Sequence, residues 1–133
     1  MTGFTIERDE ASAPFFDAAA QGTLLIRRCP TCGTLHPPQQ RRCADSEVLE
    51  WVPASGSALL VSWAVDHVPP LDPVLASSAG AVSVFGWVEL DEGPWMQVAI
   101  VDSDPAALHE GAGLHVRFVR PGDGETIPVF ALG

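Results

Sequence analysis

The sequence predicts a mainly β protein in which a short helix and a cysteine-bearing hairpin precede a closed barrel of five strands. A Cys-x-x-Cys-Gly motif occupies 29–33, and five later segments alternate apolar with polar residues. A chain of 133 residues is long enough to bury one hydrophobic core. We therefore expect an N-terminal unit over 1–52 and a barrel over 53–133.

The composition is that of a folded, acidic protein. Hydrophobic residues make up 47% of the chain and charged residues 18%, which argues against disorder. The formal net charge is −10, and such a chain is repelled by phosphate backbones, so we expect no nucleic-acid partner. The apolar runs are far shorter than a membrane span, and 1–10 lack the apolar segment of a secretory signal. We therefore expect a cytoplasmic protein without a membrane partner.

The first predicted element is a helix over 14–21. Ser12 is placed to cap it, Pro14 suits its first turn, and Gly22 follows its end. Phe15 begins an apolar face with the i, i+3, i+4 spacing of a helix. Because so short a helix is unstable alone, it must dock on another part of the protein.

The next segment predicts a rubredoxin-like zinc-ribbon hairpin. Strands over 23–28 and 48–52 enter and leave it. Cys29 and Cys32 stand three residues apart on a tight turn, and Gly33 supplies the permissive backbone that the turn needs. Two thiolates at this spacing can bind one tetrahedral ion.

The ligand set for such an ion is incomplete in this sequence. The candidate metal ligands are Cys29, Cys32 and Cys43. A fourth cysteine would be expected at Ser46, so a three-cysteine zinc site would be completed by water, Asp45 or His36. A metal-free hairpin with buried thiols is an equal alternative. Redox chemistry is disfavoured because the prolines at 37–38 prevent a helix after the motif, and we expect His36 to be an exposed strand residue.

From residue 55 onward, turn residues separate the five alternating segments. The predicted strands cover 59–68, 82–90, 95–101, 115–120 and 127–130. A hairpin turn is expected at 91–94, a helical turn at 104–108 capped by Asp104, and a long loop at 68–78. Five strands with a helical insert between the third and fourth fit a Greek-key barrel of the OB type. A five-stranded sandwich fits the periodicity almost as well.

Positive charge is concentrated in one stretch, 18–44, which contains no acidic residue. Its basic residues are Arg27, Arg28, Arg41 and Arg42. This stretch is either a site for an anion or a partner, or a solvated rim whose side chains pair with acids such as Asp45 and Glu47. Adjacent residues on a strand face opposite ways, so we expect at most one arginine of each pair to reach a given ligand.

The residues give little sign of catalysis. The chain has no G-x-S-x-G elbow, no P-loop and no dinucleotide fingerprint. Asp66 and His67 are adjacent on a predicted strand, point to opposite faces and cannot act as a dyad. Stacking of single-stranded nucleic acid is disfavoured because the barrel is acidic and we expect most of its large aromatic residues to be core. These aromatic residues are Trp63, Phe85, Trp87 and Trp95.

Several motifs, in this order along the chain, resemble those of the acyl-CoA-associated zinc-ribbon/OB-fold proteins, a domain family of unknown function. The first half contributes FF at 15–16, QGTL at 21–24, RCPTCG at 28–33, PP at 37–38, Cys43 and LEW at 49–51. The second half contributes SWAVDH at 62–67, PP at 69–70, VELDEG at 88–93, Gly113 before Val116 and IPVF at 127–130. The sequence departs from the family at Ser46, where a fourth cysteine usually stands.

The resemblance implies a non-catalytic accessory subunit that stabilises a thiolase-superfamily enzyme. Such partners include retro-aldolases that shorten CoA-linked steroid side chains, together with a hot-dog-fold hydratase. A CoA thioester would then be the ligand of the complex, and the four arginines at 27–28 and 41–42 are candidate phosphate ligands. A free-standing acyl-CoA binding or carrier module is the alternative. An obligate partner requires an apolar interface, for which we expect Phe15, Phe16, Leu71, Val74 and Leu75.

Overall fold

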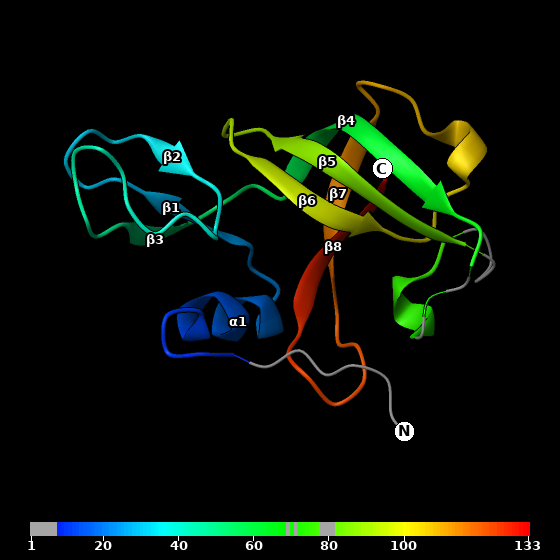
Figure 1. Ribbon diagram of the computed structural model, residues 1–133, viewed down its shortest axis with the longest axis horizontal. Coiled ribbons are helices and arrows are strands. Elements are labelled where there is room, and N and C mark those ends of the chain that lie inside the picture. Colours follow the sequence, from blue (N-terminus) through cyan, green and yellow to red (C-terminus); the bar gives the residue numbers. More distant parts are fainter. Residues whose placement is uncertain (1–7, 69, 71, 78–81) are drawn as a thin grey trace.

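The computed structural model describes residues 8–68, 70, 72–77 and 82–133. A helix, α1 (Ala13–Ala20), is followed by a three-stranded sheet and then by a closed five-stranded barrel (Figure 1). The sheet has the order β2-β1-β3, from β1 (Leu25–Arg28), β2 (Leu35–His36) and β3 (Glu50–Pro53). The predicted fold class is therefore confirmed, and the barrel excludes the sandwich alternative.

The barrel has the strand order β4-β5-β6-β8-β7. Its strands are β4 (Ser57–Asp66), β5 (Ser83–Leu90), β6 (Trp95–Ile100), β7 (Gly113–Val119) and β8 (Ile127–Leu132). Two short 3₁₀ helices, η1 (Pro73–Leu75) and η2 (Pro105–Ala107), lie in its connections. The side chain of Asp104 accepts a hydrogen bond from the Ala106 amide, as predicted for the cap of η2. No helix among the described residues has the length and apolar character required to cross a membrane.

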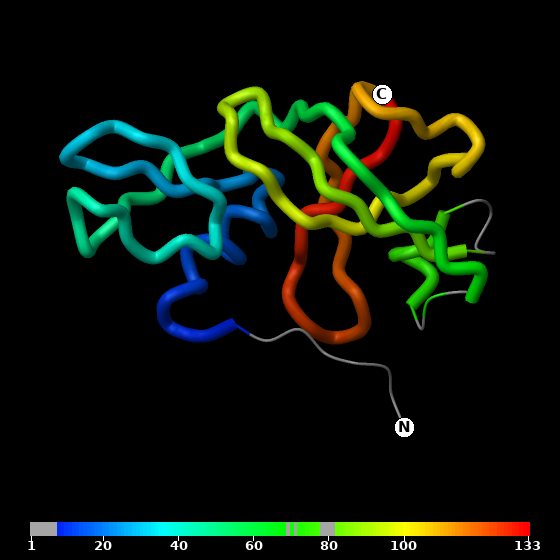
Figure 2. The backbone as a smooth tube through the Cα atoms, turned by 45° about the horizontal axis from the view of Figure 1, so that its top comes forward, coloured from blue at the N-terminus to red at the C-terminus, as the bar shows by residue number. Residues whose placement is uncertain are grey.

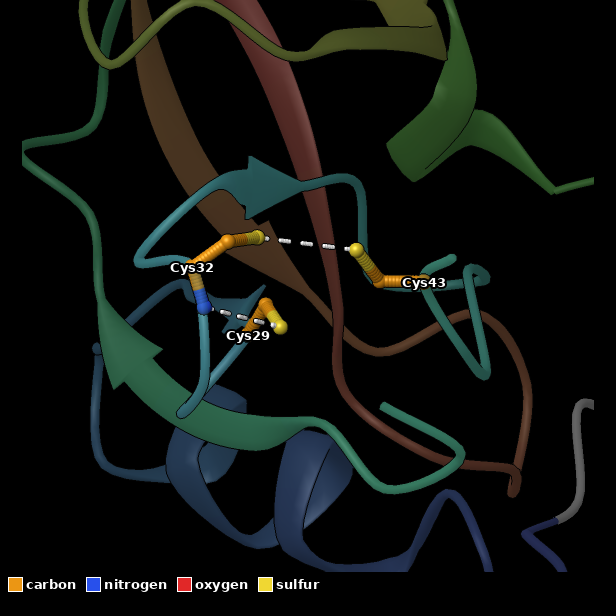
Figure 3. Close-up of side chains that lie close together, drawn as sticks. All are labelled: Cys29, Cys32 and Cys43. Carbon is orange, nitrogen blue, oxygen red and sulfur yellow. Dashed lines mark hydrogen bonds between the residues drawn. The ribbon is translucent and has the colours of Figure 1, made fainter. Parts of the chain in front are cut away.

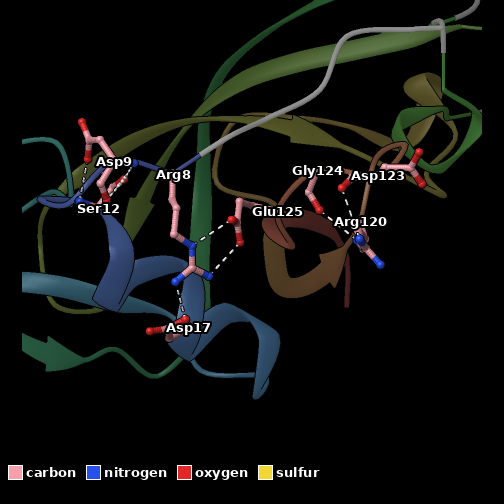
Figure 4. A network of polar contacts seen from close by, with 8 residues as sticks. All are labelled: Arg8, Asp9, Ser12, Asp17, Arg120, Asp123, Gly124 and Glu125. Carbon is pink, nitrogen blue, oxygen red and sulfur yellow. Dashed lines mark hydrogen bonds and ion pairs between the residues drawn. The ribbon is translucent and has the colours of Figure 1, made fainter.

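Helix α1 lies within one residue of its predicted bounds, and Ser12 occupies the predicted N-cap position, but its side chain makes no capping hydrogen bond. It contains Pro14 in its first turn and ends before Gly22, whose φ of +82° is favoured by glycine. The Ser12 hydroxyl was expected to cap the helix, and this expectation is wrong. That hydroxyl accepts a hydrogen bond from the Asp9 amide at 3.0 Å, while the Asp9 carboxylate accepts one from the Ser12 amide at 2.8 Å (Figure 4).

Arg8 links α1 to the loop between β7 and β8 of the barrel. Its guanidinium donates to Asp17 on α1 and to both carboxylate oxygens of Glu125, in the loop between β7 and β8 (Figure 4). The hydrogen bonds from Arg8 hold the pKa of Glu125 below its usual value. The short helix thus docks on the barrel, and it also packs against β1.

One hydrophobic core extends from the ribbon sheet into the barrel. Leu24 immediately precedes β1 and is 2% exposed, and Ile26 lies in β1 and is 0% exposed. Both belong to the same buried cluster as three barrel residues, Leu60, Ile100 and Phe130. Partly buried side chains of α1, β2 and β3 pack against this cluster. The ribbon accordingly lies directly beside the barrel in both backbone views (Figure 2).

Three of the four large aromatic residues expected in the core lie on the surface. Phe85, Trp87 and Trp95 are 45%, 40% and 49% exposed, whereas Trp63 packs against the core as expected. Strand β5 is apolar on both of its faces, so alternation alone does not tell which face is buried. The inward position between the two rings is Gly86, where a Cβ would lie only 2.7 Å from the Ser62 carbonyl oxygen. The barrel interior has no room there for a ring.

Candidate functional site

The three cysteines converge at the tip of the ribbon (Figure 3). Their sulfur atoms all lie within 4.8 Å of one another, and the Sγ atoms of Cys32 and Cys43 are 3.6 Å apart. Tetrahedral zinc with Zn–S bonds near 2.3 Å places its sulfur ligands about 3.8 Å apart. The three side chains therefore fit a zinc ion with little movement.

Two tight turns hold these sulfurs. In the first turn, Gly33 has a φ of +77° and donates to the Cys29 carbonyl at 2.8 Å, while the Cys32 amide points at Cys29 Sγ at 3.5 Å. In the second turn, Cys43 and Ser46 exchange two backbone hydrogen bonds of 2.9 and 3.2 Å. The second turn is therefore closed by its own backbone hydrogen bonds, and Ser46 lies directly opposite Cys43 although it is not a cysteine.

The thiols differ in their readiness to ionise. The Cys32 amide stabilises the thiolate of Cys29 and lowers its pKa. For Cys43, the Asp45 amide favours the thiolate, but burial and the neighbouring thiols of Cys32 and Cys29 outweigh it and raise the pKa. The buried Cys29 therefore ionises more readily than Cys43, and a metal ion would displace the remaining thiol protons.

No protein side chain in the described part of the chain completes a fourth ligand position. The Ser46 hydroxyl donates to the Val48 carbonyl at 2.7 Å and accepts from the Val48 amide at 3.2 Å. Neither Asp45 nor His36 joins the three-cysteine group. A bound zinc ion would be held by Cys29, Cys32 and Cys43, with solvent as its fourth ligand.

His36 lies in a strand as expected but is not exposed. It is paired with Arg27 across β1 and β2, it is half-buried, and its Nε2 atom is buried with no hydrogen-bond partner among the described residues.

The four candidate arginines divide into two groups. Arg27 and Arg41 line a groove of about 340 Å³ between the start of α1, the ribbon and Met96 of the barrel. Arg28 pairs with Glu50, rather than with Asp45 or Glu47. Arg42 is exposed and does not line the groove. One arginine of each adjacent pair thus faces this groove.

Aromatic side chains and one carboxylate complete the groove wall. The Arg27 guanidinium lies over the Trp51 ring, with Cζ 3.5 Å from the ring centroid, and donates to the Pro38 carbonyl. Burial lowers the pKa of Arg27, and the nearby charge of Arg41 adds to this shift. Phe15, Phe16 and Asp9 also line the groove. It can therefore hold an anionic group beside a flat apolar one.

Sequence reasoning identified the arginines but missed the other walls of the groove. Asp9 and Phe16 are far from Arg41 in the sequence, and they meet it only because α1 folds back on the ribbon. The paired phenylalanines within a short helix that must dock on another part of the protein were the available signal.

Two family models together match most of the chain. The model described as "ChsH2, rubredoxin-like zinc ribbon domain" matches residues 16–50, and "ChsH2, C-terminal OB-fold domain" matches residues 51–119. The second model alone covers more than half of the sequence. The chain belongs to the ChsH2 zinc-ribbon and OB-fold family.

Individual relatives agree with this membership. A solved structure described as "Ltp2-ChsH2(DUF35) aldolase" is similar over 94% of this chain and 96% of the matched chain, with 29% identity and a TM-score of 0.77. A DUF35-family structure of unknown function from Sulfolobus solfataricus shares the fold, with 13% identity over 93% and 86% of the two chains and a TM-score of 0.59.

One curated relative carries the name of a different enzyme. The "Probable enoyl-CoA hydratase alpha subunit" of Thermomonospora curvata is 32% identical over 127 residues. The match covers 94% of this chain but only 38% of the relative's length. A ChsH2-family domain thus also forms part of a longer protein that carries a hydratase name.

Proposed function

We propose that this chain is a non-catalytic accessory subunit of a thiolase-superfamily retro-aldolase that cleaves CoA thioesters of the steroid side-chain type. The observation that carries the proposal is the similarity, over nearly the full length of both chains, to a chain of the Ltp2-ChsH2 aldolase.

The adjacent acid and imidazole at Asp66 and His67 also fit a non-catalytic role. The Asp66 carboxylate accepts a hydrogen bond from the Val68 amide, so it stabilises the turn after β4 and does not serve as a partner for His67.

The groove beside the ribbon supports a role in completing an acyl-CoA site. Coenzyme A carries phosphate groups and a flat adenine ring. Arg27 and Arg41 can meet phosphate, and Phe15, Phe16 and Trp51 can contact the ring. Asp9 lies on the same wall, so it offsets part of the positive charge.

The same groove keeps the second candidate function open, a free-standing acyl-CoA binding or carrier module. The two functions differ in whether an enzyme subunit depends on this chain. The hydratase name of the curated relative also makes a hot-dog-fold hydratase a reasonable additional partner.

Co-expression tests the proposed function. We expect the thiolase-like aldolase to be soluble and active only when this chain is present, because obligate interfaces leave apolar surface exposed when a subunit is missing. A monodisperse monomer that binds acyl-CoA and has no effect on any thiolase-like protein would favour the carrier module. Intrinsic turnover of an acyl-CoA by the isolated chain would contradict the accessory role.

Variants of the arginines test the groove within that complex. The double variant Arg27→Gln, Arg41→Gln should weaken CoA binding by at least about tenfold, because charge-assisted hydrogen bonds to phosphate are lost. The matched control is Arg28→Gln, Arg42→Gln, which removes the same charge outside the groove. Equal affinities for the two double variants would show that the groove is not the phosphate site.

A further inference from the structure

The outer face of the three-stranded segment β4–β5–β6 carries a contiguous apolar stripe. The strand register places three rows of outward-facing side chains next to one another: Ala64, Phe85 and Ala99; Ser62, Trp87 and Gln97; Leu59, Glu89 and Trp95. Directly opposed residues on paired strands touch through their side chains. We call these nine residues the aromatic stripe. It exposes Leu59, Phe85, Trp87 and Trp95 by 40% to 49% each.

The stripe is hollowed rather than flat. One hollow of about 230 Å³ lies over Trp63 and Trp87, and a second of about 330 Å³ reaches Leu75 and Ile127. The two hollows share Phe85 and Gln97, so they form a continuous depression along the stripe.

The depression reaches η1, in the loop after β4, and the start of β8, which follows the loop after β7. The loop after β4 and the loop after β7 meet where Asp72 Oδ2 accepts a hydrogen bond from the Gly122 amide at 2.6 Å. In OB-fold barrels the second and third strands, with the loops after the first and fourth strands, form the surface that binds ligands. Here those elements are β5, β6 and these two loops, so the aromatic stripe occupies the binding surface of the fold.

Charge restricts what can cover the stripe. Glu89 is its only charged residue, and Asp91 and Glu92 follow in the adjoining hairpin. The barrel half contains ten acidic residues against Arg117 and Arg120. Arg117 is paired with Asp102, and Arg120 donates to backbone carbonyls of its own loop. A phosphate backbone would be repelled, and a second copy of this chain that docked through the same face would oppose acid with acid.

The apolar residues expected to form an interface are mostly unavailable. Phe15 packs against the core, Leu75 is 8% exposed, and Leu71 lies outside the described residues. Only Val74, at 41%, is strongly exposed among those described. The large exposed apolar area of the barrel lies instead on the aromatic stripe.

We propose that the aromatic stripe is the docking surface for a protein partner whose contact area has an apolar centre and a rim of lysine or arginine. The inference rests on the proposed function in one respect, because it identifies that partner as the thiolase-like subunit. A few residues supply most of the binding energy at protein interfaces, and tryptophan is enriched among them. Aromatic residues in general, phenylalanine included, are enriched at interface cores. The acidic hairpin beside the stripe then favours a basic rim and speeds association.

The test uses the triple variant Phe85→Thr, Trp87→Thr, Trp95→Thr of the full chain. Its three side chains point outward, and threonine suits an exposed strand, so the barrel should keep its fold. In an exchange experiment with the purified complex, the variant should displace labelled wild-type chain from the thiolase-like subunit at least about 30-fold less effectively, as for hot-spot residues. The control is Val48→Thr, which removes an apolar side chain that is 72% exposed on the ribbon, and should bind like the wild type.

Two further measurements keep the test independent of that variant. Glu89→Lys leaves the aromatic rings in place and should slow association, whereas faster association would contradict a basic rim. In the wild-type complex, tryptophan fluorescence should become less accessible to acrylamide than in the free chain, and unchanged quenching would place the interface elsewhere.

The outcomes separate this inference from the proposed function. If the wild type and the triple variant bind the thiolase-like subunit equally, the docking surface is refuted while the accessory role stands. If the wild type binds no thiolase-like subunit, both are refuted. If the triple variant only changes self-association of this chain, the stripe is an interface between copies and the inference is overturned.

Discussion

Ser46 is the residue that determines what kind of metal site the ribbon can form. In the second turn, Cys43 and Ser46 exchange two backbone hydrogen bonds, which places position 46 directly opposite Cys43. The Ser46 hydroxyl is occupied by the Val48 backbone and is not free to bind a metal ion. The ribbon is therefore one side chain short of a four-thiolate zinc site.

The variant Ser46→Cys should raise zinc affinity by at least about tenfold, because a fourth thiolate would replace a solvent ligand. Zinc content per chain, measured at a fixed free zinc concentration, checks this. Ser46→Ala is the control, since it removes the hydroxyl without adding a ligand and should leave zinc content unchanged. For both proteins zinc should be lost as the pH falls, because the thiols must be deprotonated to bind. Equal zinc in the two variants would mean that position 46 does not face the metal.

The cysteine spacing was sufficient to locate this site, because knuckle ligands are close in sequence. The fourth position was not predictable to the same extent. Whether His36 reaches the site depends on how β2 pairs with β1, and β2 has only two residues. So short a strand carries no periodicity that a sequence can display.

At the scale of single elements, β5 shows why strand positions were predicted better than strand faces. The five barrel strands occur where alternation placed them, with ends shifted by two residues at most. In β5, however, Val84 and Val88 alternate with Phe85 and Trp87, so both faces are apolar. The preference of large rings for the interior pointed to the wrong face. The close packing around Gly86 determines which face of β5 points inward, and that packing comes from residues distant in sequence.

Gly86→Ala should therefore destabilise the protein by about 1–3 kcal/mol. Its Cβ would lie 2.7 Å from the Ser62 carbonyl oxygen and 2.9 Å from Cδ1 of Ile100, and the backbone oxygen cannot move aside without disturbing β4. The matched control is Gly113→Ala at the start of β7, where no atom lies within 4 Å of the new Cβ, and its effect should stay below about 0.5 kcal/mol. Equilibrium urea unfolding measures both, and equal losses would contradict the packing argument.

At the scale of the whole molecule, the expected division into 1–52 and 53–133 does not divide the hydrophobic core. Leu24 and Ile26 belong to the cluster that fills the barrel, and Phe15, Leu35 and Val52 pack against it from the helix and the ribbon. Arg8 adds a polar link between α1 and the loop that follows β7. We therefore propose that ribbon and barrel are two sequence modules that fold as one cooperative unit.

Ile26→Ala should consequently destabilise the barrel as well as the ribbon, although Ile26 lies in the ribbon sheet. Its side chain is fully buried, so the cavity should cost about 2–5 kcal/mol. Hydrogen exchange near the denaturation midpoint should show equal loss of protection in β1 and in β5 and β6, with one unfolding transition. Loss of protection confined to β1–β3 would mean that the ribbon unfolds by itself. Joint unfolding has a consequence for the proposed complex, because a partner bound to the aromatic stripe would then stabilise the distant cysteine site through the shared core.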